Sequence, residues 1–446
     1  MSTFTEVLWY SSHMLGFLKG RLISVRLALL LTTLLLLAGG IATIYAVGHP
    51  AEPSPAGPGE DLSIYWKKQV VFAIVGFAGF LAANVVNYRR LGAVSVWLYC
   101  GVLGLLVLLL APRFVQFNLA GLIALSAADD PGAILSIYPI NSTFRWINLS
   151  LGPHSFSIQP SELCKLAHIL ALAWYLRYRS NYRSFKALVG PFLLTLLPMA
   201  LILLEPDLGT VILMMPVLFT MLFVAGAKAR HLALIALMAA LVSPLLWMKM
   251  KPYQRTRISS VLLQSSWVRH QAENRPWVAN ILLGEKFKSS QWTNHWGYHL
   301  WRSTRAVASG GENGGWGHGF RKGPFIKYRF LPERHNDFIF AVIAQQWGFW
   351  GSLILLGLYT LLAACGLEIA VGNTDPFGRL LAVGIVAMFV VEVLVNISMT
   401  MGIMPVTGLT LPFVSYGGSS LLTSFAAVGL LNNVGRCRPF SLAPKT

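Results

Sequence analysis

The chain has 446 residues, of which 55% are hydrophobic and only 12% are charged, and its mean hydropathy is +0.61. Apolar runs of about 20 residues, the length that crosses a bilayer core, recur along the sequence and exclude a soluble globular protein. The formal net charge of +18 does not indicate nucleic-acid binding, because cytoplasmic loops carry an excess of Lys and Arg and a basic surface suits anionic membrane lipids. The composition therefore predicts an all-α polytopic membrane protein.

Ten apolar segments follow one another, and each is predicted to be a transmembrane helix. They are residues 27–47, 69–87, 92–111, 163–178, 187–204, 209–226, 231–249, 337–365, 378–399 and 412–433. The short loops at one end of these helices are rich in basic side chains, such as Arg89, Arg177, Arg230 and Arg379. By the positive-inside rule this end faces the cytoplasm, and an even number of helices places both termini there.

Two long loops, residues 112–162 and 250–336, are thereby predicted to lie outside the cytoplasm. The second loop contains many Trp, Gly, Arg and Lys residues. It is either a disordered basic insertion or an interfacial segment on the outer leaflet, with Trp and Tyr at head-group depth. The number of Trp residues favours the interfacial segment.

Two polar motifs lie where the first outer loop meets the fourth predicted helix. Trp146, in RWINL, is either an interfacial anchor or, with Arg145, a surface that stacks on a sugar ring. Glu162 and Lys165, in QPSELCKL, are three residues apart on one helix face and are expected to pair. Pairing is a sufficient structural explanation, but ionisable groups inside membranes often have a function, so a contact with substrate stays open.

The motif LEPDLGT, residues 204–210, is predicted to be a tight outer turn between the fifth and sixth helices. Pro206 ends one helix and Asp207 caps the next. Glu205 and Asp207 are alternatively candidates for a metal or sugar contact.

The last outer loop, residues 401–420, is rich in Gly and Pro at membrane depth. Irregular backbone is tolerated there only where it is buried or lines a wet cavity, so a cavity is expected near the ninth and tenth helices. Glu392 and Asn396 are four residues apart on the ninth helix and are expected to form hydrogen bonds between helices.

Asp337 lies where the large outer loop meets the eighth predicted helix, in LPERHNDF. In one interpretation, Asn336 or Asp337 caps the helix, which is the commoner use of such a residue. In the other, Asp337 is a general base, because a partly desolvated carboxylate has a raised pKa and can accept a proton from a hydroxyl.

Four basic side chains surround this carboxylate in the sequence: Lys327, Arg329, Arg334 and His335. They fit the recognition of a phosphate or pyrophosphate through charge-assisted hydrogen bonds. They also fit an ordinary basic rim that is attracted to lipid head groups, and the residues alone leave both interpretations open.

Six sequence pieces, in this order, resemble the SEDS family (shape, elongation, division and sporulation), which includes RodA and FtsW. The pieces are RWINL, QPSELCKL, EPDLGT, GWGHG, FLPERHNDFIFAVIA and NISMTMGIMPVTGLTLPFVSYGGSSLL. They span most of the chain and indicate one SEDS-type membrane domain over residues 1–446. ERHND and NISM favour the RodA branch, whereas TGLTLPF is closer to FtsW, so the RodA branch is slightly favoured.

The resemblance implies a ten-span peptidoglycan glycosyltransferase of the bacterial cytoplasmic membrane. Such proteins polymerise lipid II, a disaccharide-pentapeptide on undecaprenyl pyrophosphate, at the outer face of the membrane, and work with a class B penicillin-binding protein. The essential aspartate of the family corresponds to Asp337. Its functional Trp corresponds to Trp146, the Glu and Lys of its QPSE segment to Glu162 and Lys165, and the Asp of its PDLGT turn to Asp207.

The implied mechanism is a single inverting displacement, in which Asp337 deprotonates the 4-hydroxyl of the acceptor GlcNAc and that oxygen attacks the anomeric carbon of the donor MurNAc. The candidates to hold the departing pyrophosphate are Arg334, Lys327, Arg329 and Lys165, and His335 is a further substrate-binding candidate. No residue is assigned to a metal, and a divalent cation, Mg²⁺ or Mn²⁺, stays open as a cofactor. The alternative functions are a flippase for the lipid-linked sugar and a non-catalytic scaffold for a transpeptidase.

This chain departs from the family pattern in two ways. Gln345 and Gln346 stand where many relatives have two Glu residues, which puts any role of that acid pair in doubt. Residues 112–143 and 255–295 look like insertions, and binding of a partner or of the cell envelope stays open for them.

Overall fold

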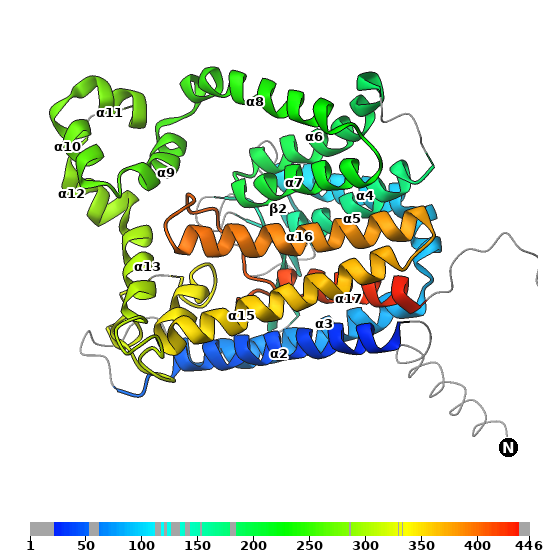
Figure 1. Cartoon of the computed structure of the whole chain (residues 1–446), viewed down its shortest axis with the longest axis horizontal. Coiled ribbons are helices and arrows are strands. Elements are labelled where there is room, and N and C mark those ends of the chain that lie inside the picture. Colours follow the sequence, from blue (N-terminus) through cyan, green and yellow to red (C-terminus); the bar gives the residue numbers. More distant parts are fainter. Residues whose placement is uncertain are drawn as a thin grey trace, which may run out of the picture.

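The computed structural model describes residues 22–52, 62–111, 117–119, 123–125, 134–138, 143–151, 154–178, 184–284, 287–328, 330–331 and 333–436. The described residues include ten long helices, and each overlaps one of the ten predicted segments. They are α2 (Ile23–Gly48), α3 (Tyr65–Val85), α4 (Tyr88–Leu110), α5 (Pro160–Leu176), α6 (Val189–Leu204), α7 (Leu208–Val224), α8 (Ala229–Lys249), α15 (Ile339–Val371), α16 (Pro376–Thr400) and α17 (Gly418–Arg436). Most of these ten helices pack in one bundle, and the seventh lies at its side with little contact (Figure 1).

Seven of the described helices are long and apolar enough to cross a membrane: α2, α3, α4, α6 with the short 3-10 turn η4 (Phe185–Leu188) before it, α8, α15 and α16. The helix α7 is apolar but has only 17 residues. The helices α5 and α17 are more polar, and they can be so because other helices cover nearly all of their side chains. The helix α16 is central and mostly buried, whereas α8 is exposed along almost its whole length.

The first long outer loop contains a small β-sheet that the all-α expectation did not include. Its strands, in sheet order, are β1 (Phe117–Leu119), β2 (Ile123–Leu125), β3 (Leu135–Ile137), β4 (Ile147–Leu151) and β5 (His154–Ile158). All neighbours are antiparallel except β2 and β3. The strands β4 and β5 form a hairpin with Leu149 opposite Phe156, and the alternation of apolar and polar residues in INLSL and HSFSI explains why they pair. Strand β5 leads directly into α5, so the hairpin fixes the entry to that helix.

The large outer loop is mainly helical. It contains α9 (Pro252–Leu262), α10 (Ser266–Asn274), α11 (Pro276–Leu283), α12 (Ser289–Gln291), the π-helical turn η5 (Trp292–Trp296), α13 (Tyr298–Ser309) and α14 (Pro324–Lys327). Helices α9 to α12 stand beyond the end of the bundle, next to the end of α8 (Figure 1). They have a small apolar core of their own around the buried Trp292. The disordered interpretation is therefore wrong for the described part of this loop, and its position on the outer leaflet stays a prediction.

Helix α15 is broken at Gly348, which has φ 63° and ψ −152°. Only glycine adopts this backbone conformation readily. The Gly-rich segment after α13 fills the break: the backbone N–H of His318 donates to the carbonyl of Gln345 (3.0 Å), and that of Gly319 donates to Gln346 (2.8 Å). The helix begins at Ile339, two residues later than predicted, and continues to Val371.

Candidate active site

A polar cavity of about 230 Å³ lies at the end of the bundle that is predicted to face outward. It collects residues from the β4 edge, the starts of α5, α7 and α17, the helix α9, the approach to α15 and the loop between α16 and α17. The lining residues are Arg145, Trp146, Gln159, Glu162, Asp207, Thr210, Arg257, Asn336, Asp337, Thr407, Gly408, Leu409, Thr410, Tyr416, Gly417, Ser419 and Ser420. The cavity expected from the Gly- and Pro-rich loop is thus present, beside the end of α16 and the start of α17.

Asp337 lines this cavity just before α15 begins. The capping interpretation is wrong, because Phe338 is the cap residue of α15 and no side chain caps this helix end. From the residues that the structure describes, the Asp337 carboxylate accepts no hydrogen bond, so it is available to a ligand. Burial, followed by the nearby charge of Glu333, raises the pKa of Asp337 to about 6, against the opposing effect of Arg257.

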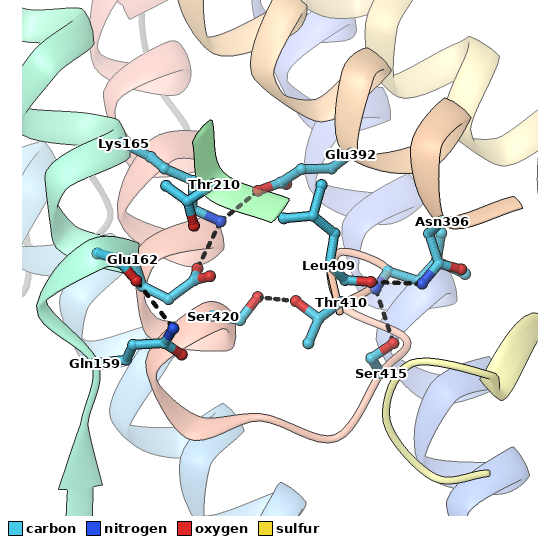
Figure 2. Close-up of polar contacts among 12 residues, drawn as sticks. Gln159, Glu162, Lys165, Thr210, Glu392, Asn396, Leu409, Thr410, Ser415 and Ser420 are labelled. Atoms are coloured by element: carbon cyan, nitrogen blue, oxygen red, sulfur yellow. Dashed lines mark hydrogen bonds and ion pairs between the residues drawn. The ribbon is translucent and has the colours of Figure 1, made fainter. Parts of the chain in front are cut away.

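The backbone around Asp337 is held firmly. The side-chain amide of Asn396, on α16, donates to the carbonyl of Asp337 (3.0 Å) and to the carbonyl of Leu409 (2.7 Å); Figure 2 shows the second of these bonds. The Ser415 hydroxyl donates to the carbonyl of Asn336 (2.8 Å). Hydrogen bonds from α16 and from the loop between α16 and α17 thus hold the backbone that carries the Asp337 carboxylate in place.

Asp207 caps α7 as predicted, and it also joins two helices. Its carboxylate accepts hydrogen bonds from the Thr210 hydroxyl (2.9 Å) and the Ser161 hydroxyl (2.9 Å), from the Gln159 amide (3.2 Å) and from the Thr210 backbone N–H (3.4 Å). The carboxylate is therefore occupied within the protein, where it aligns the starts of α5 and α7 at the cavity wall.

Lys165 lies between two carboxylates inside the bundle, as Figure 2 shows. Its Nζ is 2.7 Å from Glu162 on the same helix and 2.5 Å from Glu392 on α16. The predicted pairing of Glu162 with Lys165 is confirmed, and Glu392 adds the helix-to-helix bond expected of it. Of these three residues only Glu162 lines the cavity. Lys165 therefore lies behind Glu162 and does not contact a ligand in the cavity directly.

Two arginines bring positive charge to the cavity. Arg145 is anchored by hydrogen bonds to the backbone carbonyls of Glu205 (2.9 Å) and Pro206, at the turn between α6 and α7. Arg257, on α9, lowers the pKa of Asp337 through its charge. No local pattern distinguishes Arg257, because it is one of many basic residues in the large loop and lies 80 positions before Asp337.

The basic residues predicted around Asp337 lie elsewhere. Arg334 and His335 are buried behind the cavity wall, where the His335 ring packs against Tyr65 and Tyr416 at centroid distances of 4.6 and 5.6 Å. Lys327 forms an ion pair with Glu52. Neither Arg334, His335 nor Lys327 lines the cavity, and Arg329 lies outside the described residues.

A resident metal ion would need several His, Cys, Asp or Glu side chains close together. Within the described part of the chain, no three His, Cys, Asp or Glu side chains come close enough together to hold a metal. Of the cavity carboxylates, Asp207 is saturated by hydrogen bonds and Glu162 is paired with Lys165. The described side chains therefore do not form a metal site by themselves.

Taken together, the apolar helix bundle and the cavity at its end define an integral membrane protein with a polar site, in which one free carboxylate faces two arginines. The chain belongs to the FtsW, RodA and SpoVE family of cell cycle proteins, whose sequence model matches residues 26–438. The resemblance to the SEDS family is thereby confirmed.

Several relatives align over most of their length. The chain is 32% identical to the peptidoglycan glycosyltransferase RodA of Treponema pallidum (strain Nichols), over 91% of this chain and 96% of that protein. It is 33% identical to the stage V sporulation protein E of Bacillus subtilis (strain 168), over 92% and 96%. It is 36% identical to the peptidoglycan glycosyltransferase MrdB of Escherichia coli (strain K12), over 70% and 75%.

Solved structures show the same fold. A chain from a peptidoglycan synthase complex, studied for the coordination of polymerization and crosslinking, superposes with a TM-score of 0.64 at 29% identity and covers 92% of this chain and 96% of that one. The crystal structure of RodA from Thermus thermophilus superposes with a TM-score of 0.56 at 29% identity, covering 92% and 95%.

Proposed function

We propose that this protein is an inverting peptidoglycan glycosyltransferase that polymerises lipid II at the outer face of the bacterial cytoplasmic membrane, for cell elongation or division. Family membership and the relatives named as peptidoglycan glycosyltransferases support the reaction. The observation that carries the proposal is the unbonded carboxylate of Asp337 in a polar cavity that also contains Arg145 and Arg257. Both termini face the cytoplasm in this proposal, so that the cavity opens outward.

In the proposed step, Asp337 accepts the proton of the 4-hydroxyl of the acceptor GlcNAc. The oxygen forms a bond to the anomeric carbon of the donor MurNAc, and the bond from that carbon to the pyrophosphate oxygen breaks. The pyrophosphate leaves with the bonding electron pair, attached to undecaprenol. Attack from the face opposite the leaving group inverts the anomeric centre.

Arg145 and Arg257 are the groups that we assign to the pyrophosphate. Guanidinium groups bind phosphate through two parallel charge-assisted hydrogen bonds, and both arginines line the same cavity as the base. The carbonyls of Glu205 and Pro206 hold Arg145 without neutralising its charge. This assignment replaces Lys327 as a direct ligand, because Lys327 is paired with Glu52 outside the cavity.

Trp146 lies at the cavity beside Arg145, where its ring can stack on a sugar of the substrate. Glu162 and Asp207 line the same cavity, and Lys165 pairs with Glu162 from inside the bundle. Arg334 and His335 act indirectly in this proposal, by packing behind the segment that carries Asp337.

A class B penicillin-binding protein is the proposed partner, since a structural relative comes from a complex of polymerization and crosslinking. A divalent cation is proposed only as a companion of the substrate. Mg²⁺ usually keeps several waters and binds substrate phosphates, so the pyrophosphate and its waters would hold the cation and Asp337 would stay free to accept the proton.

The test is polymerisation of labelled lipid II by the purified full-length protein, with and without its partner. Asp337→Asn is expected to abolish glycan synthesis, whereas Glu312→Gln, which removes an exposed acid of the same outer loop outside the cavity, is expected to leave it unchanged. Glycan synthesis at the wild-type rate by Asp337→Asn would contradict the general base, and no glycan from the wild-type protein, with or without its partner, would favour a scaffold. Translocation of lipid II without polymer would favour a flippase. In the same assay, EDTA is expected to lower the rate and Mg²⁺ or Mn²⁺ to restore it.

A further inference from the structure

A second polar pocket lies at the opposite end of the bundle, where α5 ends and where α4 and α16 begin. Its volume is about 220 Å³. Its walls combine two guanidinium groups, those of Arg89 and Arg177, with the aromatic rings of Trp174, Tyr178 and Phe377. None of these residues takes part in the proposed reaction.

The pocket contains one acid, and that acid is already engaged. The Asp375 carboxylate accepts a hydrogen bond from the Tyr88 hydroxyl (2.8 Å) and an ion-paired bond from Arg89 Nε (3.2 Å). It also caps α16 by accepting from the backbone N–H of Phe377 (3.3 Å). One carboxylate therefore serves two guanidinium groups: Asp375 forms an ion pair with Arg89 and acts on Arg177 only through its nearby charge.

Arg177 has no acidic partner within the described chain. Its guanidinium stacks over the rings of Trp174 and Tyr178, donates a hydrogen bond to the backbone carbonyl of Trp174 (3.2 Å) and interacts with the Tyr178 hydroxyl. Its Nε is buried and has no hydrogen-bond partner among the described residues. A buried donor left unsatisfied costs about 1–3 kcal/mol, so an anion in the pocket would satisfy both the charge and the donor.

The surroundings indicate what carries this anion. The pocket lies at the end of the bundle that is rich in Arg and predicted to face the cytoplasm, and Trp and Tyr, which line it, are enriched where membrane proteins meet lipid head groups. Val85, the last residue of α3, and Val86, which follows it, precede the lining residue Arg89 in the chain. They are 82% and 40% exposed and offer an apolar surface to acyl chains. Basic pockets between transmembrane helices on this side of a membrane bind the head groups of anionic lipids.

We propose that this pocket binds the phosphate of an anionic phospholipid from the cytoplasmic leaflet, with Arg177 as the principal donor and Arg89 at its edge. Inorganic phosphate presents the same chemistry, but it cannot use the apolar surface of Val85 and Val86. The site is separate from the glycosyltransferase reaction, and its existence does not depend on the assignment of Asp337.

Native mass spectrometry of the delipidated full-length protein can test this site with phosphatidylglycerol, phosphatidylethanolamine and inorganic phosphate as probes. Wild type is expected to retain phosphatidylglycerol in preference to phosphatidylethanolamine. Arg177→Gln is expected to bind phosphatidylglycerol about tenfold more weakly, the loss expected for a charged hydrogen bond. The matched control is Arg230→Gln, which removes an exposed arginine at the same end of the bundle but outside the pocket and is expected to bind like wild type.

Three results would overturn the proposal. Equal retention of phosphatidylglycerol by Arg177→Gln and Arg230→Gln would remove Arg177 from the site. Equal retention of the two phospholipids would remove the selectivity for anions, and displacement of phosphatidylglycerol by equimolar inorganic phosphate would show that the source is not a lipid. Arg177→Lys, which keeps the charge but loses the stacked, forked donor, is expected to bind with intermediate affinity and provides the test if Arg177→Gln does not fold.

Discussion

The Asp337 carboxylate lies between two charges of opposite sign. Burial raises its pKa most, the charge of Glu333 raises it further and the charge of Arg257 lowers it, so that the pKa is about 6. A general base works only in its deprotonated form, so activity is expected above pH 6 and is expected to be lost as the pH falls through 6. An unperturbed Asp would keep its activity down to about pH 4.

Two substitutions should shift the pH at which activity is lost on the acid side (the acid limb of the pH profile) in opposite directions. Glu333→Gln removes the charge that raises the pKa of Asp337, so the limb should shift to lower pH. Arg257→Gln removes the charge that lowers this pKa, so the limb should shift to higher pH, and weaker binding of the pyrophosphate should also raise KM. The measurement is the pH profile of kcat/KM for lipid II polymerisation. Shifts of both variants in the same direction would show that Asp337 is not the titrating group.

Lys165 is the single cation between two buried carboxylates, at 2.7 Å from Glu162 and 2.5 Å from Glu392. Lys165→Met leaves both acids without a partner, and removal of one member of a buried ion pair typically costs about 3–5 kcal/mol. The variant is therefore expected to unfold at a clearly lower temperature in detergent. The double variant Lys165→Met with Glu392→Gln should recover part of this loss, because it removes one of the stranded charges. No recovery would mean that the lysine acts through packing.

At the scale of elements, α15 is two helices joined at a glycine. A Cβ at Gly348 would lie 2.1 Å from the carbonyl oxygen of Gly315, and its φ of +63° disfavours any other residue. Gly348→Ala is therefore expected to displace the Gly-rich segment and to lower the midpoint of thermal unfolding. Gly357→Ala is the matched control on the same helix, since a Cβ there meets no atom within 4 Å, and it should leave the midpoint unchanged or higher. A similar midpoint for both variants would show that the break is not needed.

The elements themselves were largely predictable from the sequence. Apolar periodicity located all ten long helices, because a stretch such as Leu27–Val47 has few other ways to satisfy its backbone in a membrane. The sheet in the first outer loop was missed, since the strands β1 to β3 are three residues long and depend on contacts between distant parts of the loop. The break at Gly348 was also missed, because a lone glycine in an apolar helix is common and the segment that fills the break comes from a different part of the loop.

The site was predictable only in part. Trp146, Glu162, Asp207 and Asp337 meet in one cavity, and they were recognised by motifs that carry information from related chains. Arg257 was not, because its place near Asp337 comes from the path of the large loop rather than from any local pattern. Conversely, Lys327 is near Asp337 in the sequence but pairs with Glu52, since neighbours along a loop need not share a surface.

At the scale of the whole molecule, both polar sites lie at the ends of α5 and α16, one at each side of the presumed bilayer. The proposed orientation can be checked with single cysteines in a cysteine-free background. Glu312→Cys, in the exposed turn after α13, should react with a membrane-impermeant maleimide in intact cells. Arg230→Cys, at the exposed start of α8, should react only after permeabilisation. The reverse pattern would place the cavity in the cytoplasm and contradict the proposed function.

The side-chain amide of Asn396 limits how far the polar cavity around Asp337 can change its shape when a substrate enters. By holding the carbonyls of Asp337 and Leu409 together, it gives one side of the cavity a fixed width. Ligand pockets usually occupy about 300–1,000 Å³, and the cavity has only about 230 Å³, so two sugar units require it to widen. The side of the cavity formed by α9 belongs to helices α9 to α12, which stand beyond the end of the bundle (Figure 1). The entry of each new disaccharide is therefore expected to displace Arg257 outward while Asp337 keeps its place.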